Sequence, residues 1–178
     1  MAKNDSGKNL IYKIAAEISN NDAAVLEEIN ECLSDIKKYF AENVELYKER
    51  GITRDDMENG EENFIQWIGM VDILFKHHYA CERDWKDELE DFLYFMRELE
   101  GVKSNHLTLE EDWFDEGDDV AKWCGIIDRK WAPLGMCAAA IDIDSDSYVI
   151  FPCNINVLQK LQEYTGETDF GIGRASRM

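Results

Sequence analysis

The chain has 178 residues, of which 45% are hydrophobic and 11% aromatic. These fractions exclude a disordered chain and predict one folded domain, 1–178, with its own core. Acidic residues number 38 against 19 basic ones, and the formal net charge of −19 repels phosphate backbones and anionic lipids. Nucleic acid and membrane surfaces are therefore not expected as partners. A basic protein or a cation is the natural attractant, although excess negative charge also serves solubility alone.

The cysteines and the N-terminus indicate a cytoplasmic protein. The chain has no run of 18 apolar residues, and its first residues lack the apolar run of a signal peptide. The cysteine count is odd and no CxxC pair occurs, which favours reduced, buried thiols over disulfides or a zinc site. The five cysteines are Cys32, Cys81, Cys124, Cys137 and Cys153.

Apolar residues at spacings of three and four predict two helices in the N-terminal part, 1–50. These helices cover residues 8–18 and 23–47, with a break at Asn20 to Asp22, and Gly51 ends the second. Residues 51–62 are polar and are predicted to form a connector to the main body, 63–165.

The main body is predicted to be mostly helical. Helical spacing covers residues 63–79 and 86–99, with an extended piece near 79–84 between them and Gly101 as the stop. A short helix over 109–114 and a longer one over 118–131 follow, and a last helix ends near Tyr164. The tail, 166–178, has no clear pattern.

Residues 136–153 form the one long segment with a strand pattern. They predict a β-hairpin on which a small antiparallel sheet is built, so the expected class is α+β. A four-residue loop centred on Ser145 and Asp146 would place Ile141 opposite Ile150, with both faces largely apolar. In this register Cys137 and Cys153 lie on different faces, which argues against a disulfide between them.

Three aspartates alternate in this hairpin: Asp142, Asp144 and Asp146. The pattern begins like an EF-hand loop, but Ser147 stands where that loop needs Gly and Cys153 where it needs Glu, so EF-hand calcium binding is excluded. A different divalent-cation site is one interpretation, and solvated turn residues are the other. Asp142 is expected on a covered apolar face, where a carboxylate needs a basic partner or a raised pKa.

A second group of carboxylates, Glu82 and Asp84, lies near the predicted extended piece. Asp84-Trp85-Lys86 has the acid-x-Lys form of one class of metal-dependent nucleases, in which Lys positions the attacking water. A metal-dependent hydrolase using Glu82, Asp84, Asp142 and Asp144 is therefore the alternative function. The structural interpretation is that Asp84 caps a helix starting at Trp85. No cofactor motif, nucleophile elbow or catalytic triad signature is present.

The segment from Glu82 to Asp119 holds 15 acidic and 4 basic residues, and so carries −11 of the net charge. Acids with embedded aromatics suit docking onto a basic partner, because charge speeds the approach and aromatic rings provide anchoring energy. In the alternative interpretation Trp113 and Phe114 are core residues of a short helix with a solvated back. The predicted partner-binding residues are Glu110, Glu111, Asp112, Trp113, Asp115, Glu116, Asp118 and Asp119.

Three stretches, WIGMVDIL from Trp67, CERDWKDELEDFLYF from Cys81 and AAIDIDSDSYVIF from Ala139, resemble an uncharacterised bacterial domain-of-unknown-function family. The resemblance covers residues 61–161 and implies a compact α+β domain in a small, acidic cytoplasmic protein. In size and acidity the chain is also similar to immunity proteins that neutralise basic toxins. The leading hypothesis is a non-enzymatic interaction module that binds a basic partner; the sequence indicates no oligomeric state.

Overall fold

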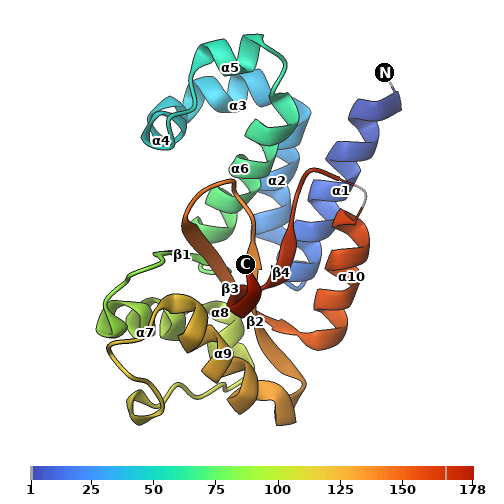
Figure 1. Cartoon of the computed structure of the whole chain (residues 1–178). Coiled ribbons are helices and arrows are strands. Elements are labelled where there is room, and N and C mark those ends of the chain that lie inside the picture. Colours follow the sequence, from blue (N-terminus) through green and yellow to red (C-terminus); the bar gives the residue numbers. More distant parts are fainter. Residues whose placement is uncertain (1, 167) are drawn as a thin grey trace. The chain divides into compact units, whose positions relative to one another are not determined.

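A computed structural model describes residues 2–166 and 168–178 (Figure 1). The chain divides into two compact units, Met1–Leu74 and Phe75–Met178. The predicted connector at 51–62 contains a short helix, α5 (Arg54–Glu58), and the division between the units falls later, inside α6 (Glu62–Lys76). None of the helices in the described ranges is both long enough and apolar enough to cross a lipid bilayer.

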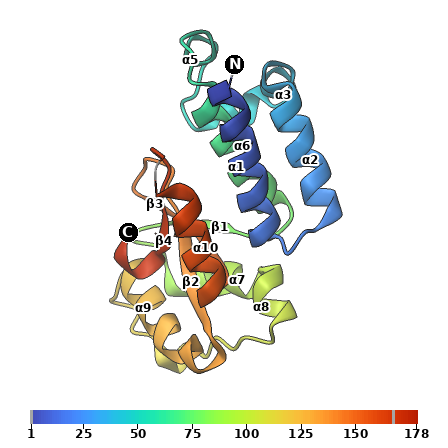
Figure 2. The ribbon, with the colours of Figure 1, turned by 90° about the vertical axis from the view of Figure 1, so that its right-hand side faces the viewer.

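The first unit is helical, and α1 (Ala2–Ile18) and α2 (Ala23–Ser34) run side by side (Figure 2). The prediction of one helix over 23–47 is wrong, because α3 (Ile36–Glu42) and α4 (Val44–Glu49) follow as separate helices. Asp35 ends α2 in a non-helical conformation, and its carboxylate accepts the Lys38 backbone N–H at the start of α3. The apolar spacing continues across these breaks, so periodicity alone does not reveal them.

Side chains of the first unit's core pack closely against Gly69 on α6. The Tyr47 hydroxyl donates to the Ile65 carbonyl oxygen across 3.3 Å. A Cβ added at Gly69 would lie 2.7 Å from Tyr47 Oη and 2.8 Å from Cys32 Sγ. Glycine is therefore required there by close packing, and its φ is not in the left-handed region.

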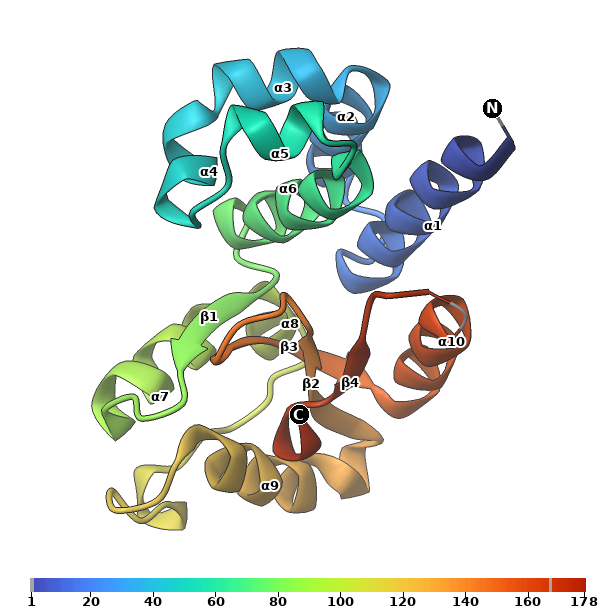
Figure 3. The same ribbon diagram turned by 45° about the horizontal axis from the view of Figure 1, so that its top comes forward.

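The second unit contains a four-stranded antiparallel sheet in the order β1-β3-β2-β4 (Figure 3). The strands are β1 (Cys81–Asp84), β2 (Met136–Ile141), β3 (Ser147–Asn154) and β4 (Ile172–Arg174). Its helices are α7 (Leu89–Glu98), α8 (Glu100–Ser104), α9 (Val120–Trp131) and α10 (Ile155–Thr165). The predicted α+β class, mostly helical with one small antiparallel sheet, is confirmed.

The sheet is covered on both faces, as the hairpin pattern predicts. Ala138, Ala140 and Ile150 belong to the core cluster shared with α7, α8 and α9, and α10 packs along β2, β3 and β4. All six residues of β2 are buried. A strand with no solvated face reads as a continuous apolar run, which is what the sequence shows.

Several helix ends differ from prediction. Gly101 does not stop a helix but lies inside α8, which follows α7 directly. The short helix expected over 109–114 is a single 3-10 turn, Glu111–Trp113. Helix α7 begins at Leu89, so Asp84 does not cap a helix that starts at Trp85.

The predicted hairpin register is wrong by one residue. Ile141 pairs with Val149, and Cys137 lies directly opposite Cys153. Ile141 and Val149 are the last pair before the turn, so the turn is centred on Ser145, and Asp144 takes a left-handed φ of 57°. Seven residues separate this pair, whereas the predicted register has eight, and this difference of one shifts every pair and places the two cysteines on one face. Both cysteines are free thiols.

The last residues, from β4 onward, are held by contacts distant in sequence. Strand β4 pairs with β2, and the turn Ala175–Arg177 follows it. Asp128 on α9 accepts hydrogen bonds from the Ala138 backbone N–H and the Ser176 hydroxyl, both at 3.0 Å, and pairs with Arg174 at 3.0 Å. One carboxylate thus ties α9, β2, β4 and the last turn together.

Candidate interaction surface

The acidic loop, residues 107–119, connects α8 to α9 and is held by side chains of the helices around it. Arg97 Nη2 donates to the Leu109 carbonyl oxygen at 2.7 Å. Trp131 Nε1 donates to the Thr108 carbonyl at 2.9 Å, and Trp123 Nε1 to the Asp115 carbonyl at 2.8 Å. Trp123 and Trp131 are buried, so these donors fix the loop backbone from the core.

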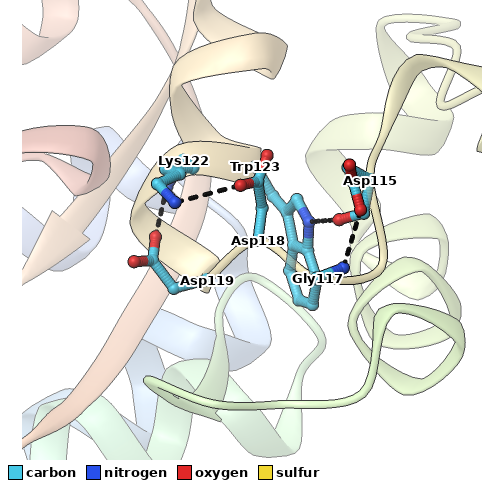
Figure 4. A network of polar contacts seen from close by, with 6 residues as sticks. All are labelled: Asp115, Gly117, Asp118, Asp119, Lys122 and Trp123. Carbon is cyan, nitrogen blue, oxygen red and sulfur yellow. Dashed lines mark hydrogen bonds and ion pairs between the residues drawn. The ribbon is translucent and has the colours of Figure 1, made fainter.

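Three of the predicted partner-binding acids build the loop's C-terminal end (Figure 4). The Asp115 carboxylate accepts the Gly117 N–H at 2.8 Å, and Asp119 caps α9 by accepting the Lys122 N–H at 2.9 Å. Asp118 pairs with Lys122 Nζ at 3.0 Å, and this hydrogen bond raises the pKa of the lysine. These carboxylates fold the loop and are only partly available to a partner.

The other four acids, Glu110, Glu111, Asp112 and Glu116, are exposed. None of them makes a side-chain hydrogen bond or an ion pair within the part of the chain that the structure describes. Their charges are therefore solvated on a backbone that cannot move freely.

The two aromatics of this loop are half-buried. Phe114 packs against the core cluster, and its ring lies 6.1 Å from that of Trp113. Lys130 Nζ lies 4.6 Å from the centre of the Trp113 ring and covers one of its faces. Trp113 is thus only partly buried, and one face of its ring is already covered by Lys130. Its role in binding a partner stays a prediction.

A second feature, the Trp85 pocket, lies at the hairpin loop. This pocket of about 540 Å³ is lined by Trp85, Ala140, Ile141, Asp142, Ser145, Asp146, Ser147, Tyr148 and Met178. Trp85 is 45% exposed, and its backbone carbonyl accepts the Val120 N–H at 3.3 Å. That bond places the pocket beside Asp119, the end of the acidic loop.

The pocket wall is organised by the hairpin loop. The Asp142 N–H donates to the Gly171 carbonyl at 2.8 Å, and the Asp142 carboxylate accepts the Asp144 N–H at 2.9 Å. Asp142 is exposed, so the expectation of a carboxylate on a covered face is wrong; β2 ends at Ile141, one residue earlier. Opposite, the Tyr148 hydroxyl donates to the Met178 carbonyl at 3.2 Å, and burial together with the Asp119 carboxylate raises its pKa.

The predicted metal-ligand candidates do not converge. Glu82 and Asp84 lie on β1 and pair with Val149 and Ser147, and the Asp84 carboxylate accepts the Lys86 N–H at 2.9 Å. Asp142 and Asp146 share the Trp85 pocket, whereas Asp144 is not part of its lining. No three Asp, Glu, His or Cys side chains in residues 2–166 and 168–178 are grouped to hold a metal ion.

Sequence reasoning missed Trp85 as a surface feature, because the residues around it come from β2, the hairpin loop, β3 and the last residue of the chain. The one signal was a tryptophan set between charged residues, Asp84 and Lys86, outside any apolar stripe.

Comparison with known proteins places the chain in a family. Residues 10–176 match the family described as Domain of unknown function (DUF6630). The chain belongs to this family. The family covers the N-terminal helices as well, so it reaches further at both ends than the 61–161 expected from the resemblance. No curated protein and no solved structure matches the chain.

Proposed function

We propose that this protein is a non-enzymatic interaction module that binds a basic protein partner through the acidic loop. One observation carries the proposal. Four exposed carboxylates lie on the acidic loop, and the backbone of this loop is held by hydrogen bonds from Arg97, Trp123 and Trp131. A charged surface that is already ordered loses little conformational entropy on binding. It also attracts an oppositely charged partner over long range and so raises the association rate.

The distribution of charge supports this proposal. Residues 107–119 hold seven acidic and no basic residues, whereas the two units as wholes have the same two-to-one excess, 22 against 11 in the second and 16 against 8 in the first. Five free cysteines suit a reducing cytoplasm, which we propose as the site of action. The partner would be a basic protein of the same compartment, and neutralisation of a basic toxin is one such role.

The test compares two variants that lose the same charge. The loop-neutral variant carries Glu110→Gln, Glu111→Gln, Asp112→Asn and Glu116→Gln. Its control carries Glu27→Gln, Glu49→Gln, Glu58→Gln and Glu61→Gln, all at exposed positions of the first unit. Both changes add four to the net charge, so a difference between the variants reports position and not total charge.

Each protein is immobilised and exposed to lysate of the source cells at about 50 mM salt, where surface charges are weakly screened. Proteins released at about 500 mM salt are identified by mass spectrometry and the binding of each is then measured with purified components. We expect one or a few basic proteins to bind wild type and the control but to bind the loop-neutral variant at least tenfold more weakly. Equal binding by the loop-neutral variant would refute the proposal.

Thermal unfolding of the protein with and without divalent cations tests the alternative function, a metal-dependent hydrolase. A cation that binds only the folded state raises the melting temperature. The proposal predicts no rise in melting temperature at millimolar Mg²⁺, Mn²⁺ or Ca²⁺. A clear rise would favour the hydrolase, with the carboxylates of β1 and the hairpin loop as candidate metal ligands.

A further inference from the structure

We infer that the Trp85 pocket receives an arginine side chain of the basic partner. This assignment rests on the proposed function, since it names the group of that partner that would be anchored. The acidic loop would provide long-range attraction, and the pocket next to it would provide the specific contact.

The lining of the pocket is complementary to a cation. Asp142 and Asp146 contribute carboxylates, the two serines contribute hydroxyls, and no lysine or arginine is among the nine lining residues. Asp119, next to the pocket, adds a further negative charge near Tyr148. Ala140, Ile141 and Met178 supply apolar surface suited to the aliphatic stem of a long basic side chain.

The indole of Trp85 favours a planar cation. Trp67, Trp123 and Trp131 are buried and Trp113 is half-buried, which leaves Trp85 as the exposed tryptophan of the described chain. Lys86 Nζ lies 4.3 Å from the centre of its ring, so the ring already holds a cation of this chain. A guanidinium can stack on an indole while its N–H groups donate to carboxylates, which an ammonium cannot do with the same geometry.

The pocket is also held in shape by backbone contacts. The hairpin loop is fixed by the bonds from Asp142 to Gly171 and from Ser147 to Ser145 Oγ, the latter at 3.1 Å. Trp85 is fixed by Val120 at the start of α9. A preformed pocket binds a side chain without first ordering its own walls.

The experiment titrates the intact protein with N-acetyl-L-arginine amide and follows the indole N–H resonances by NMR. The resonance of Trp85 is assigned with Trp85→Phe. We expect a saturable shift of that resonance alone, with the lysine amide binding several-fold more weakly and the neutral citrulline amide producing no shift. A Trp85 resonance that does not move, or that moves equally with citrulline, would overturn the inference.

Two substitutions in the same loop give a matched control. Asp146 lines the pocket and Asp144 does not, although both are exposed. Asp146→Asn should weaken binding of the arginine amide by about fivefold, and Asp144→Asn, which keeps a residue that tolerates a left-handed φ, should leave it within about twofold. An equal loss of arginine-amide binding in the two variants would mean that binding depends on the total charge of the loop and not on the pocket.

Lys86→Met tests the competing cation. Removing the ammonium from the indole should strengthen arginine binding by about threefold, because a repelling charge is lost. Weaker binding in this variant would count against the pocket as a cation site.

The two proposals can fail separately. The arginine amide carries one charge and reports on the pocket directly, whereas lysate capture reports on the acidic loop. If capture of basic proteins depends on the acidic loop but the Trp85 resonance does not shift with the arginine amide, the pocket assignment alone is wrong. If Trp85 responds but the loop-neutral variant captures the same proteins, the role of the acidic loop is wrong.

Discussion

The two compact units differ in the role of their buried polar side chains, although the buried Tyr47 hydroxyl of the first unit does bond, to the Ile65 carbonyl within the core. In the first unit, the Gln66 amide and the Ser19 hydroxyl are buried and have no hydrogen-bond partner among the described residues. In the second unit, the indole N–H groups of Trp123 and Trp131 reach from the core to carbonyls of the acidic loop. The interior of the first unit is thus a close-packed scaffold, and that of the second fixes a surface loop in place.

This difference favours the second unit as the part of the protein that binds a partner. A rigid loop with exposed charges is a binding device, whereas tight packing around Gly69 serves stability. Substitutions in either unit therefore test the contrast.

Gly69→Ala should destabilise the first unit by about 3 kcal/mol or more, because its Cβ would overlap Tyr47 Oη and Cys32 Sγ. Urea unfolding followed by circular dichroism measures the loss. Gly7→Ala is the control, since the nearest atom to its Cβ is Asn63 Oδ1 at 3.5 Å and alanine is the better helix former, so stability should stay equal or rise. A tolerated Gly69→Ala would show that this core is loosely packed.

Raising the pH from 7.5 to 9 should lower the free energy of unfolding by roughly 3 kcal/mol. Burial raises the pKa of Cys32 and Cys81 to about 12 and that of Cys137 to about 11, and raises that of Cys124 as well. The unfolded thiols release protons near pH 8.5 and the folded ones do not, so stability is full below that pH and falls above it. Cys137→Ala should remove about a quarter of the loss measured by urea unfolding at the two pH values. A pH-independent stability would contradict the burial of these thiols.

Trp131→Phe should cost about 2 kcal/mol, because it leaves the Thr108 carbonyl without its donor and removes buried surface. It should also loosen the acidic loop, so that a Glu-specific protease cuts after Glu110 or Glu111 faster than in wild type. Trp113→Phe, at a half-buried position, should cost under about 1 kcal/mol and leave cleavage unchanged. Equal cleavage in both variants would mean that the core does not fix the loop.

Gln66→Met should be neutral or stabilising by about 1 kcal/mol, because the buried amide forms no hydrogen bond with the described residues and methionine has a similar volume. Gln159→Met, at an exposed position, should change stability by less than about 0.5 kcal/mol. A loss above about 1 kcal/mol in the Gln66 variant would show that the amide has a partner.

Much of the fold could be predicted, because it depends on local patterns. Helical spacing found α6, α7, α9 and α10 within a few residues, and the strand pattern found the hairpin and the burial of both its faces. The breaks at Asp35 and Asn43 were missed because the apolar stripe crosses them. The register was missed because the turn is centred on Ser145 and not between Ser145 and Asp146, which leaves one residue fewer between paired positions and changes every pair without changing the apolar pattern.

For the candidate surface, composition and motif spacing are enough to predict the excess of acidic residues, their concentration before α9 and the absence of a catalytic motif. Which of these acids bond within the protein and which stay solvated depends on the folded chain. Asp115, Asp118 and Asp119 bond within the loop and to α9, while Glu110, Glu111, Asp112 and Glu116 remain solvated. Only the tertiary structure also brings Trp85 to Asp142 and Asp146. The reason is that hydrogen bonds and pocket walls join residues distant along the chain, and composition and periodicity carry no information about such pairs.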